Sequence, residues 1–257
     1  MLNECIQCLV EQTYEGPITI WVVDDKSTDN TKGLVDRWAG KTAASGSFDP
    51  RRRLGYLEGP GYSNFRPGAI HKSFFDHCLR VKDDYVAYQF SDDYCQLNRV
   101  HEQVMGMEES DAKWSFCGTT NFVNEHRSKK RQVSHSFSRE MQMRPSKGPT
   151  LPVYGFMVHR QSFIDAGGCE EPERCGRSAE AWIVAHCGLM GDPHVANTIM
   201  FFREHPTNLG ATGRAGQALY KRATAVTGMT EDDHHALWDQ IAPVYNERVN
   251  RARRLHV

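Results

Sequence analysis

The sequence predicts an α/β fold in which a mainly parallel, Rossmann-like sheet is flanked by helices. Two apolar runs, residues 18–23 and 85–90, are rich in β-branched and aromatic residues, and each ends at a pair of adjacent carboxylates. Helical patterns separate these runs, and alternation of strand and helix is typical of a doubly wound parallel sheet. The chain of 257 residues is long enough for one sizeable α/β domain or two small ones.

The first half of the chain alternates helices and strands. Apolar residues recur at helical spacing from Met1 to about Gln12, so we expect an amphipathic helix there. The elements expected after it are, in order, a strand at 18–23, a helix from about Lys32, a short strand at 54–57, a helix at 69–79 and a buried strand at 85–90.

The second half continues with a helical pattern directly after Asp93, with Leu97, Val100 and Val104 on one face. Further along we expect strands at 114–119 and 156–158, a helical turn at 160–166, and an amphipathic helix opening near residue 178. A Gly-rich loop at 210–216 and a helix that begins near residue 230 then suggest a division into a domain of residues 1–209 and a helical C-terminal extension of residues 210–257.

The two acidic pairs, Asp24–Asp25 and Asp92–Asp93, lie where a ligand is expected. Ligands of open α/β sheets bind at the carboxyl ends of the strands. Paired carboxylates suit a hard divalent cation, which in turn suits a diphosphate. The alternative for Asp92 and Asp93 is a solvated turn in which one of them caps the following helix.

Composition narrows the classes of function. The formal net charge of −1 argues against a general polyanion binder, although basic segments such as 248–254 leave a nucleic-acid role open. The sequence has no apolar run long enough to span a bilayer and no secretory signal pattern, so we expect a soluble, cytoplasmic protein. Cys5-x-x-Cys8 lies on a helical pattern without a second such pair, so we expect half-buried reduced thiols rather than a zinc or redox site.

Several segments resemble those of a known family. They are LNECIQCLVEQTY with ITIWVVDDKSTDNT, FSDDYCQLNRVHEQV, GFMVHRQSFIDAGG and FFREHPTN. Together they resemble family 2 glycosyltransferases of the GT-A fold, over about residues 2–208. The resemblance implies a metal-dependent, inverting transfer of a sugar from a nucleoside diphosphate sugar, such as a UDP-sugar, to an acceptor hydroxyl.

The resemblance also implies residues that bind the donor. Asp25 would accept the base N–H of the nucleotide, with Asp24 in the same pocket, because a carboxylate recognises a base through its N–H donor. Arg66 would reach a base carbonyl, and Asp92 would lie near the ribose or the ion. The simpler alternatives are that Asp25 caps a turn and that Arg66 is a surface charge.

For the metal and the catalytic base, the resemblance points to three positions. Asp93 would coordinate Mn²⁺ or Mg²⁺ on the donor diphosphate, and His205 would add a further metal contact; the alternative for His205 is a surface imidazole paired with Glu204. Glu180 would be the general base, and its alternative is an ordinary glutamate in the first turn of a helix. Many inverting members carry an acidic pair here, whereas this chain has Ala181 after Glu180.

Two departures from the family keep a second function open. Ala181 cannot accept a proton, which favours a catalytically weakened member that still binds nucleotide sugar. The family also has an apolar strand before its first helix, whereas Met1 stands where that strand should have ended, so we expect a late start or a truncated chain. Loss of a central strand would leave neighbouring backbone groups unpaired, at about 1–3 kcal/mol each.

A third possible function is a sugar transferase that acts on nucleic acid. A homo-oligomer is compatible with the expected C-terminal helix.

Overall fold

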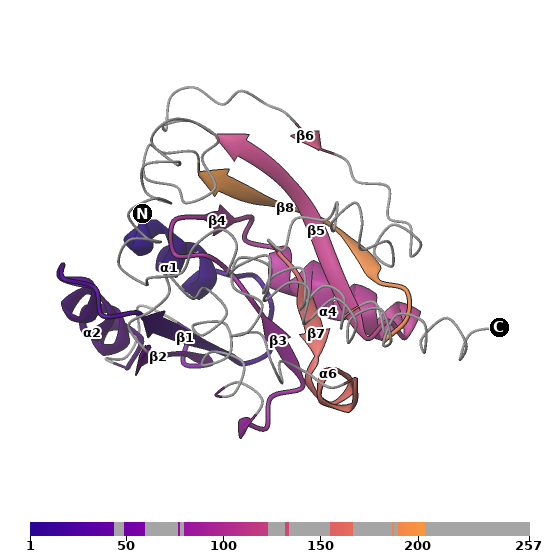
Figure 1. Cartoon of the computed structure of the whole chain (residues 1–257), viewed down its shortest axis with the longest axis horizontal. Helices are drawn as coiled ribbons and strands as arrows, with labels where there is room; N and C mark the ends of the chain where they lie inside the picture. Colours follow the sequence, from indigo (N-terminus) through magenta and orange to yellow (C-terminus); the bar gives the residue numbers. More distant parts are fainter. Residues whose placement is uncertain are drawn as a thin grey trace, which may run out of the picture.

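A computed structural model describes residues 1–43, 49–59, 77, 80–122, 132–133, 155–166, 187 and 190–203 of the protein. Helices and strands are interspersed along the chain and mixed in space (Figure 1). The elements are α1 (Leu2–Val10), β1 (Ile18–Asp24), α2 (Thr31–Ala43), β2 (Arg52–Glu58), β3 (Tyr85–Ala87), β4 (Tyr94–Cys95), α4 (Arg99–Ser110), β5 (Trp114–Phe122), β6 (Gln132–Val133), β7 (Met157–His159), α6 (Arg160–Asp165) and β8 (His194–Arg203).

The strands form two sheets. β1 and β2 pair in parallel as a two-stranded sheet, and the larger sheet has the order β3-β7-β5-β8-β4, with β6 paired to β5. Its longest pairing, between β5 and β8, is also parallel, whereas the antiparallel pairings extend over only two or three residues. The predicted α/β class with parallel pairing is therefore confirmed, with short antiparallel strands added around it.

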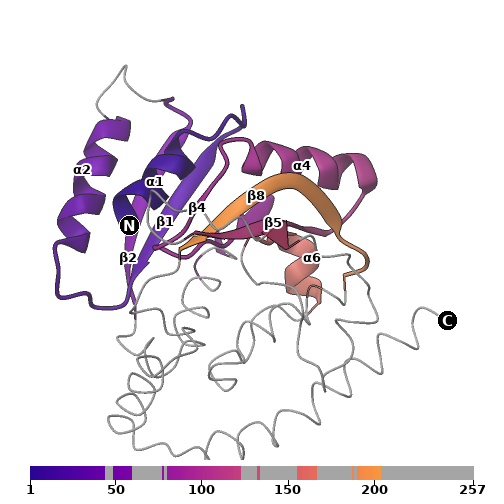
Figure 2. The same ribbon diagram turned by 90° about the horizontal axis from the view of Figure 1, so that it is seen from above.

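Helices cover both faces of the larger sheet. Figure 2 shows α4 on one face and α6 on the other. The largest group of buried apolar side chains lies within this layer, because alternate residues of β5, Trp114 and Phe116, turn inward to meet Val86, Val158 and Phe163. Each of these five side chains is at most 4% exposed. The larger sheet and its helices thus supply the rigid support behind the acidic turn.

Helix α1 joins the two sheets. On one side Ile6 and Val10 pack with Ile20 of β1 and with α2, which gives the smaller sheet its core. On the other side Cys8 packs with Cys95 of β4 and with side chains of β5 and β8. α1 is therefore buried on two sides, although its sequence suggests an ordinary amphipathic helix.

Two expectations around the second acidic pair are wrong in detail. The strand expected at 85–90 ends at Ala87, and the helix expected directly after Asp93 begins only at Arg99. The intervening residues 94–95 form β4, which pairs with β8 more than a hundred residues later in the chain. Asn98 is the N-cap of α4, so neither acidic residue caps it, and Leu97 is 43% exposed rather than part of the apolar face.

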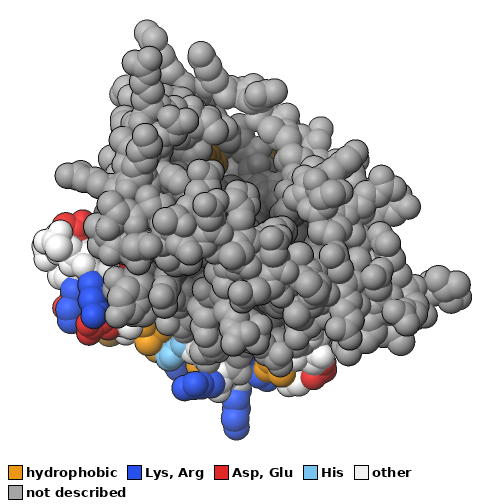
Figure 3. All heavy atoms as spheres, in the orientation of Figure 1, with side chains coloured by type: hydrophobic (Ala, Val, Ile, Leu, Met, Phe, Trp, Pro, Cys, Tyr) orange, Lys and Arg blue, Asp and Glu red, His pale blue; other side chains and the backbone are white. Residues whose placement is uncertain are grey.

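Charges of both signs lie next to one another on the surface near α2 (Figure 3). One such pair in α2 is Lys32 with Asp36, whose Nζ and Oδ2 are 2.8 Å apart. Among the helices that the structure describes, none has the length and apolar character needed to cross a membrane. The helices expected near residue 178 and in the extension 210–257 lie outside the described residues, as does most of the helix expected at 69–79.

Candidate active site

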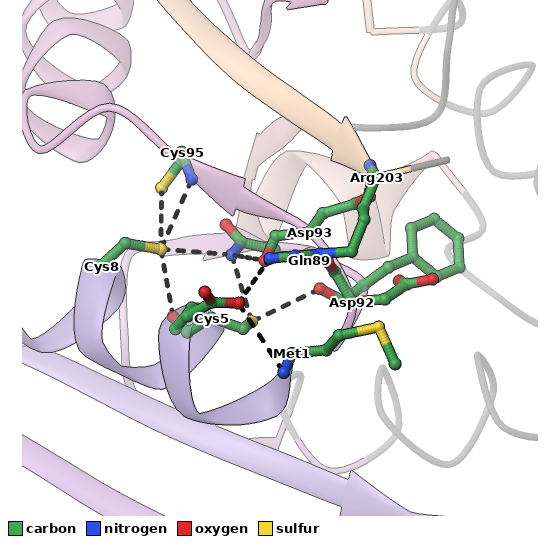
Figure 4. Close-up of polar contacts among 10 residues, drawn as sticks. Met1, Cys5, Cys8, Gln89, Asp92, Asp93, Cys95 and Arg203 are labelled. Atoms are coloured by element: carbon green, nitrogen blue, oxygen red, sulfur yellow. Dashed lines mark hydrogen bonds and ion pairs between the residues drawn. The ribbon is translucent and has the colours of Figure 1, made fainter. Parts of the chain in front are cut away.

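The second acidic pair forms a tight turn between β3 and β4. The N–H of Asp93 lies 3.3 Å from the carbonyl oxygen of Phe90, which closes the turn. Asp93 is 1% exposed, and its Oδ1 accepts a hydrogen bond of 2.9 Å from the backbone N–H of Arg203. Its Oδ2 is buried without a hydrogen-bond partner among the described residues. One carboxylate oxygen is thus fixed in place while the other is left available to a ligand (Figure 4).

The electrostatics of Asp93 suit a cation. Burial raises the pKa of this carboxyl to about 7, and the negative charge of Asp92 adds to the effect, against the opposing influence of Arg203. A buried carboxylate oxygen without a donor is costly, and a divalent cation satisfies such an oxygen. Within the described parts of the chain no three His, Cys, Asp or Glu side chains are grouped as a complete ion site. Asp93 therefore fits a metal whose other ligands come from the substrate or from residues outside those parts.

Arg203, the last residue of β8, ties the acidic turn to α1. Its Nε donates to the carbonyl oxygen of Asp92 at 2.9 Å, and its Nη2 forms an ion pair with Glu4. The Arg203 side chain is only 12% exposed. The turn is therefore held from three directions, by β8, by α1 and by its own backbone hydrogen bond.

The first acidic pair ends β1 and has its own set of contacts. Asp24 is 6% exposed, its Oδ1 accepts from the N–H of Ser27 at 3.0 Å, and its Oδ2 accepts from the hydroxyl of Tyr56 at 2.7 Å. Burial alone would raise the pKa of Asp24, but the hydrogen bonds from Ser27 and Tyr56 together lower it below its usual value. The same bond raises the pKa of Tyr56 to about 12. Asp24 is thus a charged support for the turn, and the next residue, Asp25, is partly exposed.

A buried polar network lies beneath the second acidic pair. Arg99 is 1% exposed and donates from Nη1 to Oε1 of Gln89 at 2.8 Å. Gln89 in turn donates from Nε2 to the carbonyl oxygen of Asp93 at 3.3 Å and to Sγ of Cys5 at 3.2 Å and of Cys8 at 3.5 Å. A hydrogen bond from Cys95 lowers the pKa of the Cys8 thiol, with help from Gln89 and from the charge of Arg99, although burial opposes it. The network extends from α4 through the acidic turn to α1.

The structure locates four of the seven predicted site residues. Asp92 and Asp93 lie together with Glu4 and Arg203, whereas the described contacts of Asp24 remain within β1, β2 and the following turn. No described hydrogen bond joins Asp24 to the second acidic pair. The remaining three residues, Arg66, Glu180 and His205, lie outside the described residues.

Sequence reasoning missed three residues that shape the site. Glu4 and Arg203 are 199 residues apart, and nothing local to either position predicts their contact. Gln89 gave a weak signal, because it is the one strongly polar side chain within the apolar run 85–90. A partly buried amide just after a strand needs partners, and here those partners include the acidic turn and two thiols.

Several solved structures with a similar fold contain a uridine nucleotide. One is S. aureus TarS 1-349 in complex with UDP, at a TM-score of 0.54 and 13% identity, covering 92% of this chain and 64% of that one. The same protein in complex with UDP-GlcNAc gives a TM-score of 0.56 at 12% identity, covering 96% of this chain and 68% of that one. GalNAc-T7 with UDP, GalNAc and Mn²⁺ gives 0.51 at 10% identity, covering 86% of this chain and 44% of that one.

These likenesses show the GT-A fold that the sequence predicted. They also show that the chain spans only part of the length of most of these proteins, 64% of TarS 1-349 and 44% of GalNAc-T7 in the comparisons above. Family membership rests on the sequence itself: the family described as "Glycosyl transferase family 2" matches residues 1–167, which is more than half of the chain and includes both acidic pairs. The chain therefore belongs to glycosyl transferase family 2.

Proposed function

We propose that the protein is a metal-dependent, inverting glycosyltransferase that moves a sugar from a UDP-sugar to an acceptor hydroxyl. Membership of family 2 supports sugar transfer, and the UDP and UDP-GlcNAc bound by TarS support a uridine nucleotide donor. The Mn²⁺ present with GalNAc-T7 supports use of a divalent cation. The observation that carries the proposal is the buried Oδ2 of Asp93 in the turn between β3 and β4, which has no hydrogen-bond partner among the described residues.

In this proposal the donor is held by residues on both sheets. Asp25 accepts the N–H of the base while Asp24, fixed by Ser27 and Tyr56, keeps the turn in shape. Arg66 reaches a base carbonyl, and Asp92 lies near the ribose. Positioning of the sugar by such a pocket accounts for much of the rate in a displacement reaction.

Asp93 and His205 are the proposed metal ligands. The chemistry that Mn²⁺ or Mg²⁺ would supply when bound there is neutralisation of the negative charge on the departing nucleoside diphosphate. Because Oδ1 of Asp93 already accepts from the backbone N–H of Arg203, Oδ2 is the oxygen that would hold the ion. The buried network below the turn keeps that oxygen in place.

Glu180 is the proposed general base. It removes the proton from the acceptor hydroxyl, whose oxygen attacks the anomeric carbon from the face opposite the diphosphate, and this single displacement inverts the anomeric configuration. Ala181 follows it in the sequence, so no second carboxylate is adjacent in the chain. The assignment of Glu180 rests on the family pattern.

Calorimetric titration with UDP, with and without Mn²⁺, tests the donor site. Asp93→Asn keeps the size of the side chain but removes the charge, so we expect it to weaken Mn²⁺-dependent UDP binding by more than about tenfold. Asp84→Asn is the matched control, because Asp84 is an exposed carboxylate just before β3 and should leave binding unchanged. Equal UDP affinity of the wild type and Asp93→Asn would refute the metal site.

A second candidate is a member that binds UDP-sugar without transferring it, which Ala181 favours. Both candidates bind UDP with Mn²⁺, but only the first consumes UDP-sugar in the presence of an acceptor or water. A panel of UDP-sugars assayed for UDP release separates them. Release that depends on Asp93 and Glu180 supports the enzyme, and binding without any release supports the alternative.

A further inference from the structure

Two cysteines from different elements meet beside the acidic turn. Sγ of Cys8 on α1 lies 3.7 Å from Sγ of Cys95 on β4 (Figure 4). Both thiols are free and buried, with 7% and 3% exposure. They are 87 residues apart, so the Cys5-x-x-Cys8 spacing alone gave no sign of this pair.

The surroundings of Cys8 favour reaction at that sulfur. Its Sγ accepts from the backbone N–H of Cys95 at 3.4 Å and lies within 3.5 Å of the side-chain amide of Gln89. N–H donors around a sulfur stabilise its thiolate, which is the nucleophilic form. Both thiols donate to a backbone carbonyl oxygen, Cys8 to that of Cys5 at 3.1 Å and Cys5 to that of Phe90 at 3.4 Å, but among the described contacts of these two thiols only Cys8 accepts from a backbone N–H. Cys8 is therefore the attacking thiol and Cys95 its nearest sulfur partner.

A structural zinc site does not explain the cluster. Such a site needs about four ligands, and the described residues contain no group of three His, Cys, Asp or Glu side chains arranged to hold an ion. Among the described cysteines the sulfur–sulfur contact joins Cys8 and Cys95 alone, and the nearby Gln89 and Gln12 side chains act as donors rather than as ligands. Formation of a disulfide between Cys8 and Cys95 fits this arrangement better than metal binding does.

We propose that Cys8 and Cys95 form an oxidation site for hydroperoxides, which closes a disulfide between α1 and β4. The Cys8 thiolate attacks a peroxide oxygen, the O–O bond breaks, and Cys8 becomes a sulfenic acid as hydroxide leaves. The thiol of Cys95 then attacks this sulfur, an S–S bond forms, and water leaves. In total two thiols lose two electrons and two protons, and one hydrogen peroxide becomes two waters.

The burial of Cys8 limits the size of the oxidant that can reach its sulfur. Since Cys8 is only 7% exposed, a peroxide of a few atoms reaches it more readily than a bulky disulfide such as oxidised glutathione. Closure brings the sulfurs from 3.7 Å to about 2.05 Å, which requires a small movement of α1 toward β4.

Formation of the disulfide should affect the acidic turn, because the turn is linked to the thiols by hydrogen bonds. Gln89 contacts Cys8 and also donates to the carbonyl oxygen of Asp93, while Cys5 donates to Phe90 at the start of the turn. A shift of α1 strains these bonds. This effect on ligand binding rests on the proposed function, and we expect UDP affinity in the presence of Mn²⁺ to fall by about fivefold, the factor that corresponds to the loss of one hydrogen bond.

Peptide mapping tests the oxidation site without any assay of activity. The purified protein is treated with hydrogen peroxide, desalted, alkylated and digested with trypsin, and we expect a disulfide between the fragments of residues 1–26 and 83–99. Cys5→Ser should still form it and assigns the link to Cys8, whereas Cys8→Ser should not. Cys187, which is buried elsewhere with 1% exposure, serves as the internal control and should remain a thiol. Calorimetry with UDP and Mn²⁺ then compares the oxidised, desalted protein with the same sample after reduction.

Each result tests a different part of the proposal. Absence of the cross-linked fragments, or a link through Cys5, overturns the oxidation site. A complete link with unchanged UDP affinity overturns its coupling to the acidic turn. Failure of the reduced protein to bind UDP refutes the proposed function, while the peptide map still decides whether Cys8 and Cys95 react.

Discussion

Asp93 shows how burial sets the chemistry of a single residue. Its carboxyl is 1% exposed, one oxygen accepts from Arg203, and the other has no described partner. Burial raises its pKa from the usual 3.8 to about 7. The folded protein therefore holds a proton on Asp93 that the unfolded chain releases between these two pH values.

This shift predicts a pH dependence of stability in the absence of metal. Because the folded-state pKa lies above the unfolded one, the stabilisation is fully present below about pH 4 and is lost as the pH rises through 7, by up to about 4 kcal/mol. Asp93→Asn should lack this loss, so its free energy of unfolding should exceed that of the wild type at pH 8 with a chelator present. Urea unfolding at pH 5 and pH 8 measures the difference, and parallel pH profiles of the two proteins would contradict it.

At the scale of elements, Arg99 anchors helix α4 to the larger sheet. Its side chain is 1% exposed, and its Nη2 donates to the carbonyl oxygens of Tyr88 at 3.1 Å and Phe156 at 3.3 Å, which follow β3 and precede β7. A buried cation is favourable only when acceptors surround it. The helix, the strands and the acidic turn are thus held by one guanidinium.

Replacing this anchor should destabilise the protein. Arg99→Met keeps most of the volume but leaves the acceptors on Gln89, Tyr88 and Phe156 without their donor, so we expect the free energy of unfolding to fall by about 2–4 kcal/mol. Arg53→Met, at an exposed position of β2, is the control and should change stability by less than about 0.5 kcal/mol. Equal urea midpoints for the two variants would show that Arg99 is not an anchor.

The same elements show what could be predicted from the sequence. Local patterns located α1, β1, α2 and β5, because apolar spacing and strand composition are properties of neighbouring residues. They misplaced the start of α4, because residues 94–95 become a strand only through pairing with β8. At the site, the sequence predicted that Asp93 follows a strand, but β3 already ends at Ala87 and Asp93 lies in the turn before β4, and its contact with Arg203 depends on tertiary packing that no local pattern encodes.

At the scale of the whole molecule, the two sheets differ in how well they are supported. β5 lies between β7 and β8 in the larger sheet, whereas β1 and β2 form a sheet of two strands. A pair of strands is marginally stable alone and depends on helices packed against it. α1 and α2 supply that packing here.

This difference predicts the pattern of amide hydrogen exchange. Amides of β5 and β8 should exchange at least about tenfold more slowly than those of β1 and β2, because they open only when the larger sheet opens. Exchange measured by mass spectrometry on peptides of both sheets checks this. Addition of UDP and Mn²⁺ should slow exchange at residues 89–93, and unchanged exchange there would count against binding at the acidic turn.

The ring of Trp21 lies at the junction between the two sheets. It packs edge-on against the ring of His77, with centroids 4.2 Å apart, and touches the main group of buried side chains. Its neighbour across the strand pair is Gly55, and a methyl group at position 55 would collide with the indole ring. The position of the Trp21 ring thus depends on the absence of a side chain at position 55. Position 55 is consequently a place where protein engineering could loosen the two-stranded sheet of β1 and β2 without replacing any of the four carboxylates of the two acidic pairs.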